Sequence, residues 1–277
     1  MKLHPGVLMV WTGLLSLSLA APALAYVRSA DSKTGACLWW QSRTMQYYAN
    51  EGCSDDVPLA SCLAAVDASG QTWNQQSCTD LLFVFKGSTP RTDVGFDQSN
   101  WSNNINLMIW QETTWTHDRR AIGLTTTTYD TETGRVVDAD VEFNGKYFTF
   151  STSDSAVRTD IRNTLTHELG HCIGLDHNSL PDSTMYANAD EGEVTKRNLS
   201  QDDIDGECFI YPKDQKTPSC IPESASKKSG CGCGALASGL GDPGASLPLL
   251  LGIFGWIGLR LRRRLGPAFP RAKKLIG

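Results

Sequence analysis

The chain has 277 residues and a formal net charge of −5, and this length suffices for one or two domains with a full hydrophobic core. The charge is unevenly distributed, because residues 26–212 carry 13 Lys and Arg against 27 Asp and Glu, a balance of −14, while the C-terminus is basic. An acidic central region repels phosphates, which argues against nucleic acid as a partner.

The first 25 residues have the pattern of a secretory signal peptide. A basic residue and a short apolar run precede Ala23-Leu24-Ala25, which predicts cleavage before Tyr26. A transmembrane anchor is the alternative, and the shortness of the apolar run speaks against it. Export also accounts for the nine cysteines, because disulfides persist outside the cytosol.

An odd number of cysteines lies between this leader and residue 230, so at least one is free or paired elsewhere. The seven are Cys37, Cys53, Cys62, Cys78, Cys172, Cys208 and Cys220. Their spacing does not determine the connectivity. The pairing that we predict is Cys37–Cys78, Cys53–Cys62 and Cys172–Cys208.

Several short segments of the acidic region have the periodicity and composition of β-strands. Alternation and aromatic residues indicate a strand at 42–50, and short apolar runs indicate buried strands at 81–86 and 105–110. Residues 121–130 and 136–143 are expected to form a hairpin, joined by the turn sequence TETGR.

Three segments have helical patterns, so the domain is expected to be α+β. Residues 57–76 place four apolar side chains on one helix face: Leu59, Leu63, Val66 and Trp73. Residues 153–175 begin with Ser and Asp, which favour a helix N-terminus, and carry apolar residues at helical spacing. Residues 199–211 predict a last helix that starts at Ser200.

The second helical segment contains the string H-E-x-x-H-x-x-G-x-x-H. His167 and His171 lie one turn apart on the same helix face, so both imidazoles can reach one metal ion. Gly174 can adopt a positive φ and end the helix, and the turned chain then brings back His177 as a third nitrogen ligand. Three nitrogens leave a fourth tetrahedral position for water, which is typical of catalytic zinc. Glu168 follows the first ligand, where it can act as the general base.

Two weaker interpretations of this string remain. The histidines could be solvated residues of an amphipathic helix, or they could hold a structural or sensing zinc without catalysis. The complete string in an exported chain argues against the first interpretation. The presence of Glu168 argues against the second.

Residues 167–186, HELGHCIGLDHNSLPDSTMY, resemble the zinc-binding motif and Met-turn of the metzincin zinc endopeptidases, and most closely those of the matrixins. Residues 198–212 resemble the last helix of the matrixin catalytic domain, and the resemblance covers approximately residues 37–212. It implies a metzincin-like zinc protease domain at 26–212. That domain would have a small, twisted, mixed sheet and three helices, with the active-site helix carrying the zinc motif.

The resemblance assigns roles to individual residues. It makes His167, His171 and His177 the ligands of one catalytic zinc and Glu168 the catalytic acid/base. It makes Met185 the hydrophobic floor beneath the zinc. Gly174 supports the site at the turn before the third ligand. Tyr186 directly follows the methionine, whereas zinc-binding tyrosines of relatives lie two residues after it, so Tyr186 is not counted as a ligand.

The sequence also departs from the matrixin pattern. Matrixins carry a second, structural zinc bound by histidines, but His117 is the only one left over, so no such site is predicted and His117 is expected to be an exposed loop residue. A PRCGxPD-type latency segment is not present. Matrixins also bind calcium, and oxygen ligands could come from four residues near the hairpin: Asp138, Asp140, Glu142 and Asn144. A solvated acidic hairpin is the favoured alternative.

The C-terminal part is predicted to be a sorting signal. Residues 213–230 have the composition of a linker. Residues 231–265 contain CGCG, an apolar run and RLRRRL, which resembles the MYXO-CTERM sorting signals of surface proteins, and 266–277 form a basic tail. The resemblance implies membrane contact, removal of the tail and lipidation of a cysteine. The protein would then reside at the cell surface or outer envelope, or outside the cell. A plain membrane anchor is the alternative.

The predicted function is that of an exported zinc-dependent metalloendopeptidase acting on protein or peptide substrates. A peptide would align as a strand along residues 121–128, and residues 187–197 would border the pocket for the residue following the cut. One alternative is a surface-displayed, zinc-containing binding module without hydrolysis. Another is an enzyme acting on a non-peptide ester or amide. The sequence leaves the oligomeric state open.

Overall fold

The structure, a computed structural model, describes residues 25–218, 220 and 272–274. Within these residues no helix has the length and apolar character needed to cross a membrane. The expected sorting signal at 231–265 lies outside the described residues, as does the expected signal peptide except for Ala25.

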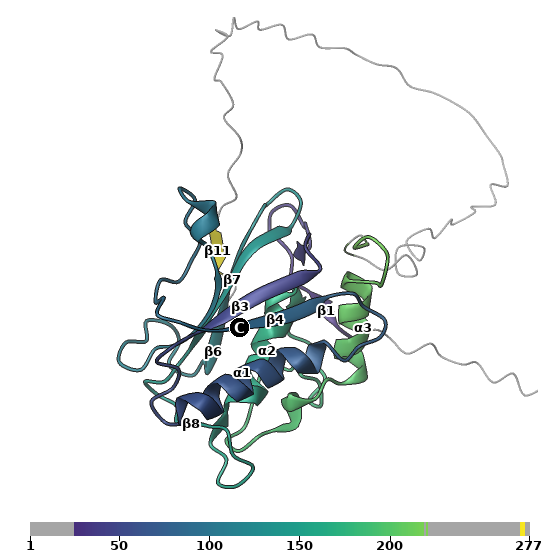
Figure 1. The fold of residues 1–277 in the computed structure, drawn as a ribbon. Helices are drawn as coiled ribbons and strands as arrows, with labels where there is room; N and C mark the ends of the chain where they lie inside the picture. Colours follow the sequence, from purple (N-terminus) through teal and green to yellow (C-terminus); the bar gives the residue numbers. More distant parts are fainter. Residues whose placement is uncertain (1–24, 219, 221–271, 275–277) are drawn as a thin grey trace, which may run out of the picture.

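A seven-stranded mixed sheet forms one layer of the domain (Figure 1). The strand order is β11-β6-β7-β5-β3-β4, with β2 beside β7. Strands β2, β3, β4, β5 and β7 are parallel to one another, whereas β6 is antiparallel to β7 and β11 is antiparallel to β6. The bounds are β2 Trp39–Trp40, β3 Thr44–Asn50, β4 Leu82–Thr89, β5 Asn106–Trp110, β6 Gly123–Tyr129, β7 Arg135–Phe143 and β11 Ala272–Lys274.

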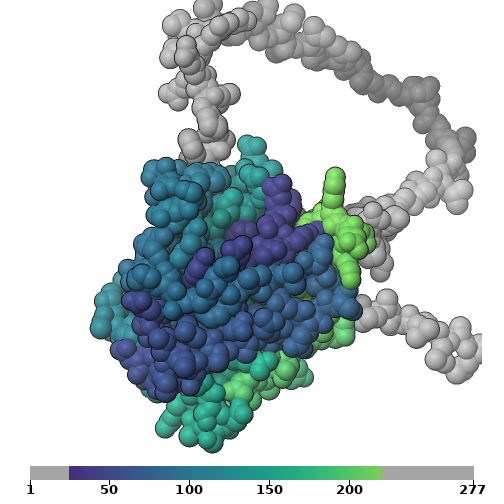
Figure 2. Space-filling model, in the orientation of Figure 1, coloured from purple at the N-terminus to yellow at the C-terminus, as the bar shows by residue number. Residues whose placement is uncertain are grey.

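Helices α1 (Leu59–Trp73) and α2 (Ile161–Cys172) cover one face of this sheet, and α3 (Gln201–Ile210) lies at one end (Figure 1). In the view of Figure 2 the segments from β3 through α1 to β4, in blue, form the near face, and α3, in green, closes the right side. The α+β architecture with three helices, expected from the sequence, is confirmed. The remaining short elements are β1 Val27–Arg28, β8 Phe150–Ser151, β9 Thr159–Asp160, β10 Leu175–Asp176 and the 3₁₀ turns Trp101–Asn103 and Thr195–Arg197.

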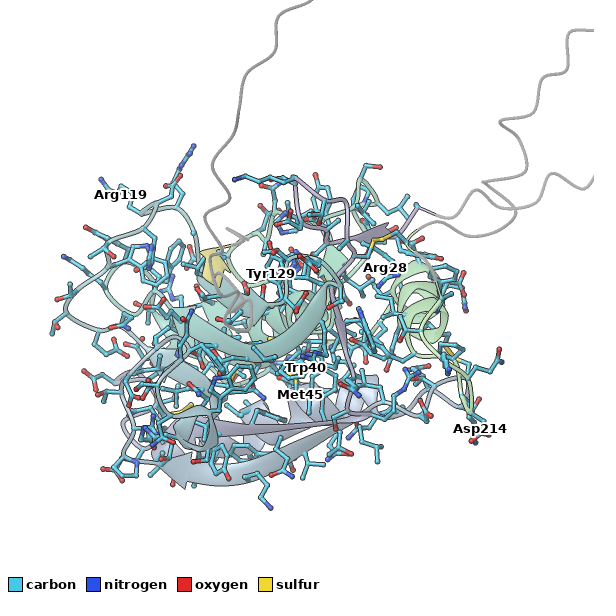
Figure 3. The ribbon with its side chains drawn as sticks, turned by 90° about the horizontal axis from the view of Figure 1, so that it is seen from above. Arg28, Trp40, Met45, Arg119, Tyr129 and Asp214 are labelled. Carbon is cyan, nitrogen blue, oxygen red and sulfur yellow. A yellow bond between two sulfur atoms is a disulfide. The ribbon has the colours of Figure 1, made fainter. Side chains whose placement is uncertain are left out.

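Helix α2 is held in place by two buried tryptophans. The indole Nε1 of Trp73 donates to the carbonyl of Thr166, at 3.0 Å, and that of Trp40 donates to the carbonyl of Cys172, at 2.7 Å. Figure 3 shows Trp40 in the middle of the molecule, with Arg119 at the periphery. A buried indole needs an acceptor for its N–H, so these bonds orient α2 as well as burying the rings.

One prediction about burial is wrong. Strand β4 was expected to be buried, but it is the edge of the sheet, and Leu82 is 49% exposed. Of the apolar residues expected on one face of helix α1, Val66 and Trp73 are buried, whereas Leu59 is 43% exposed. An apolar run predicts an element, but the neighbours of that element decide which of its residues are covered.

Helix α2 starts later than the predicted residue 153. Its N-cap is Asp160, whose carboxylate accepts a hydrogen bond from the backbone N–H of Asn163, at 2.7 Å. The residues before it satisfy their own backbone, since Ser153 Oγ accepts from the N–H of Ser155, at 3.1 Å. Such local bonds compete with helix formation, so the first polar cluster forms a loop and the later aspartate caps the helix.

Two of the three predicted disulfide pairs are wrong. Cys53–Cys62 is confirmed, but the other bridges are Cys37–Cys220 and Cys78–Cys208. Cys172 is free and buried. Its thiol faces the sheet near Thr125 instead of α3, which is why it does not bridge to Cys208.

Candidate metal centre and active site

Three histidine nitrogens converge on one point. The Nε2 atoms of His167, His171 and His177 lie 3.1–3.2 Å apart in every pairing. Among the described residues this is the one cluster of at least three potential His, Cys, Asp or Glu ligands. Ligands held at ~2.0–2.1 Å in a tetrahedral zinc site lie ~3.3–3.4 Å apart, so the three nitrogens fit a zinc ion with small outward shifts.

The backbone fixes the orientation of the two helical histidines. His167 Nδ1 lies 2.6 Å from the carbonyl oxygen of Thr184, and His171 Nδ1 lies 2.9 Å from that of Leu175. A carbonyl only accepts, so each Nδ1 carries the proton and each Nε2 presents its lone pair to the centre. Burial lowers the pKa of all three ring systems, which favours the neutral form that binds metal.

The third histidine reaches the site because Gly174 reverses the chain. Gly174 has a φ of +94°, and a Cβ at this position would lie 2.3 Å from the carbonyl oxygen of Leu38. Strand β10, which follows immediately, pairs with β1 and fixes the direction of the returning chain. The left-handed turn predicted at Gly174 is therefore present, and the close approach of the backbones excludes a side chain.

The Glu168 carboxylate lies between α2 and the first strand residues of β6. Its Oε2 accepts a hydrogen bond from Thr125 Oγ1, at 2.6 Å, and a Cβ on Gly123 would lie 2.6 Å from its Oε1. Glu168 is 3% exposed, and this burial raises the pKa of its carboxyl to about 7, against the lowering effect of the Thr125 hydrogen bond. A carboxyl with such a pKa is matched to proton transfer near neutral pH.

Met185 is buried against the zinc-binding helix. A Cβ on Gly170 would lie 2.2 Å from the Met185 sulfur, so the methionine packs directly on α2 between the first two histidines. The backbone around it is fixed by Asp203 of α3. This carboxylate accepts from Ser183 Oγ at 2.5 Å and from the N–H groups of Thr184 and Met185 at 2.8 and 3.1 Å.

Asp203 is a positioning residue that the sequence reasoning missed. It is fully buried, forms the capping box of α3 with Ser200 and holds Thr184, whose carbonyl in turn orients His167. The signal was present in the sequence, since Ser200 and an acid three residues later form a capping-box pattern. That pattern predicts a helix start but not the second contact of the carboxylate with the Met-turn.

A cavity of about 150 Å³ adjoins Glu168. Its lining includes Gly123 and His167 beside the Glu168 carboxylate, together with the segment 187–189 and Lys196. It shares Ile122, Asn163, Thr164 and Ala189 with a larger cavity of about 490 Å³. Space for a side chain is therefore available next to the candidate base.

Comparison with known proteins gives the family of this site. The family model of the matrixins matches residues 40–212, which is more than half of the chain. The chain belongs to the matrixin family. Matrixins use zinc, in agreement with the histidine triad, and a protease domain of this family implies a protein or peptide substrate.

Individual matrixin relatives match over short stretches. Human matrix metalloproteinase-25 is 40% identical over 73 residues, which are 26% of this chain and 13% of the relative. Human matrilysin is 39% identical over 62 residues, 22% and 23% of the two chains. Human neutrophil collagenase is 49% identical over 45 residues, 16% and 10%. The matched stretches thus span less than a quarter of each of these relatives.

In this matrixin the leftover histidine is less exposed than expected. His117 Nε2 lies 3.5 Å from Glu142 Oε2, and the ring packs edge-on against Trp115 with centroids 4.9 Å apart. Its side chain is 16% exposed, and it is not a member of the triad. The prediction of an exposed loop residue is therefore wrong.

The four oxygen donors considered for calcium do not form a solvated hairpin. Asp140 is buried, and its two oxygens accept from the N–H groups of Gly95 and Leu107. Glu142 accepts from Gln111, and the Asn144 side chain donates to the carbonyl of Ala121 and accepts from the N–H of Tyr147. Asp138 is 2% exposed, and its Oδ2 has no hydrogen-bond partner among the described residues.

Asp138 gives the stability of this matrixin a pH dependence. Burial, together with the neighbouring Asp140, raises the pKa of Asp138 to about 8. The folded state therefore holds a proton on Asp138 that the unfolded state has lost above pH ~4, and the contribution of this one group to stability falls as pH rises from ~4 to ~8, by at most ~1.4 kcal/mol per pH unit. Asp138→Asn should flatten this fall and unfold at a higher denaturant concentration than wild type at pH 8. Exposed Asp182→Asn, an equal charge change, should leave the profile unchanged; the same flattening in both variants would contradict the assignment to Asp138.

Proposed function

We propose that this chain is an exported zinc endopeptidase that hydrolyses peptide bonds with Glu168 as acid/base. The observation that carries the proposal is the convergence of three neutral imidazole nitrogens beside a buried carboxylate whose pKa is about 7. His167, His171 and His177 would hold one zinc ion. Three protein nitrogens leave the fourth position open, as in catalytic zinc sites.

Different residues of the chain would have different roles in the reaction. When bound, zinc supplies Lewis-acid polarisation of the scissile carbonyl and of water. Glu168 Oε1 or Oε2 takes a proton from the attacking water and later gives it to the departing amine. Thr125 orients that carboxylate through its hydroxyl. Thr184 and Leu175 keep the Nε2 lone pairs of His167 and His171 directed to the ion.

A peptide substrate would extend the sheet along the side of β6 that faces away from β7. Support comes from the chain itself, because β11 (Ala272–Lys274) pairs antiparallel with Thr126–Thr128 of this strand. The edge therefore has the geometry to receive an extended segment through main-chain hydrogen bonds. Gly123 and Thr125, which contact Glu168, lie on the same strand, so an aligned peptide would pass the catalytic carboxylate.

We also propose export through the signal peptide at 1–25 and display at the surface, or release, through the signal at 231–265. Three disulfides support an oxidising compartment. Cleavage before Tyr26 is supported by its backbone nitrogen, which lies 2.8 Å from Asp202 Oδ1. Cleavage would convert this amide into an α-amino group beside a carboxylate, which is a charge-assisted pair.

The test of the proposed function is zinc content together with cleavage. The exported chain should bind one zinc per molecule and cleave an unfolded protein, and a chelator should remove both properties. Small esters should be cleaved more slowly than peptides. A chain that binds zinc and cleaves neither substrate would favour the binding module, and faster cleavage of esters would favour the non-peptide hydrolase.

Calcium binding is a second and separate proposal, carried by Asp138 alone. Its unpartnered, buried Oδ2 would gain a partner in a cation. Added calcium should therefore raise the melting temperature of wild type but not that of Asp138→Asn. Equal shifts in the two proteins would remove this site from consideration.

A further inference from the structure

Lys196 is a buried cation at the cavity beside Glu168. It is 4% exposed and lies in the 3₁₀ turn Thr195–Arg197, which packs against α2. Its Nζ donates to the carbonyl oxygens of Tyr186 and Asn188, at 2.7 and 2.5 Å. These two bonds use two of the three ammonium protons. They also hold in place the segment after the Met-turn, which forms one wall of the cavity.

No carboxylate among the described residues is hydrogen-bonded to Lys196. Both acceptors of its ammonium group are neutral carbonyls, and the carboxylate of Glu193, its ion-pair partner, lies 4.0 Å from Nζ, beyond hydrogen-bond distance. Glu168 and Asp203 act on its charge without a hydrogen bond, and the Tyr186 ring centroid lies 5.8 Å from Nζ. Burial of a cation is costly unless a carboxylate is paired and hydrogen-bonded with it. A carboxylate that enters the cavity would meet this requirement.

Apart from Glu168, the remaining polar side chains that line the cavity are neutral or basic, which suits a short acidic side chain. Asn163, Thr164 and Asn188 contribute neutral polar groups, and Arg120 stands at the cavity as a second cation, paired with Asp118 on the surface. The volume of about 150 Å³ admits a side chain of the size of Asp or Glu. The acidic residues Asp190 and Glu193 line the larger, adjoining cavity and not this one.

The cavity is the pocket expected from the sequence for the residue following the cut, and we propose that Lys196 makes an acidic residue, Asp or Glu, the preferred one there. The inference rests on the proposed function, because it assigns specificity to the same catalytic site. The segment 187–197, expected from the sequence to border this pocket, contains both Lys196 and the loop wall that it holds.

The test compares the full exported chain on peptides that differ only in the residue following the cut: Glu, Gln, Leu or Lys. Wild type should show kcat/KM at least ten times higher for Glu than for Gln. Lys196→Met should bring this ratio close to one, and Lys196→Glu should favour the Lys peptide. Exposed Lys86→Met is the matched control and should keep the wild-type ratio.

The ratio separates specificity from folding, because partial unfolding lowers the rates on all four peptides by the same factor. A wild-type preference for Leu or Lys would overturn the inference while leaving the endopeptidase intact. So would a Lys196→Met variant that slows all peptides equally, since the lysine would then only hold the loop. Wild type that binds zinc and cleaves no peptide or unfolded protein would overturn the proposed function itself, and the inference with it.

Discussion

Glu168→Gln should keep its zinc and lose cleavage, with kcat/KM reduced by about 10²–10⁴-fold, the typical contribution of a general base. Glutamine has nearly the same shape and can still accept the hydrogen bond of Thr125, but its amide cannot take a proton from water. The three imidazole nitrogens are unchanged, so metal content should remain at the wild-type level. The measurement is metal analysis alongside kinetics on one peptide.

The control for this variant is Glu51→Gln, which removes an exposed carboxylate at the end of β3. It should retain wild-type activity and zinc. Retention of more than about a tenth of the activity in Glu168→Gln would show that another group accepts the proton. Loss of zinc in the same variant would instead point to a role of Glu168 in holding the site together.

Gly174→Ala should destabilise the domain by about 2–4 kcal/mol and weaken zinc binding. The new Cβ would lie 2.3 Å from the Leu38 carbonyl oxygen, and a positive φ alone costs a non-glycine residue about 1–2 kcal/mol. The neighbouring backbone cannot yield easily, because the Gly174 carbonyl accepts the Ser29 N–H at 2.9 Å. Any shift moves His177, three residues on. Denaturant unfolding and zinc titration measure the two effects.

Gly192→Ala isolates the steric part of that cost. Gly192 also has a positive φ, +85°, but a Cβ there would meet its nearest neighbour, the Val157 carbonyl oxygen, only at 3.6 Å. This variant should therefore cost only the backbone strain and leave zinc affinity unchanged. Equal losses of stability in the two variants would mean that the contact with Leu38 does not constrain Gly174.

The convergence of the three histidines was predictable from the sequence because its geometry is mostly local. His167 and His171 are neighbours on any helix. Gly174, which follows them, can adopt the positive φ that ends the helix. The supporting contacts are not local. Asp203 orients the Met-turn from α3, and Thr125 reaches Glu168 from β6, so no spacing in the sequence could have indicated either pair.

The fold, too, was predictable where it depends on local sequence patterns and not where it depends on distant contacts. Elements with strong periodicity, such as β5 and the β6–β7 hairpin, were predicted with small errors in their ends. Burial and disulfides were less predictable. Leu82 is exposed because its strand lies at an edge, and Cys172 is free because its side of the helix faces the sheet. Both outcomes depend on which elements become neighbours, which is a property of the assembled sheet.

Because β11 pairs with β6, the C-terminal segment and a peptide substrate would compete for the same backbone groups. The N–H and C=O groups of Thr126–Thr128 can bond to residues 272–274 or to an aligned peptide, but not to both. A chain that keeps its C-terminus thus carries its own competitor, present at a high effective concentration because it is tethered. Removal of the C-terminal segment would then lower the apparent KM for peptides and leave kcat unaltered. This processing step would therefore raise the apparent affinity of the protein for peptides.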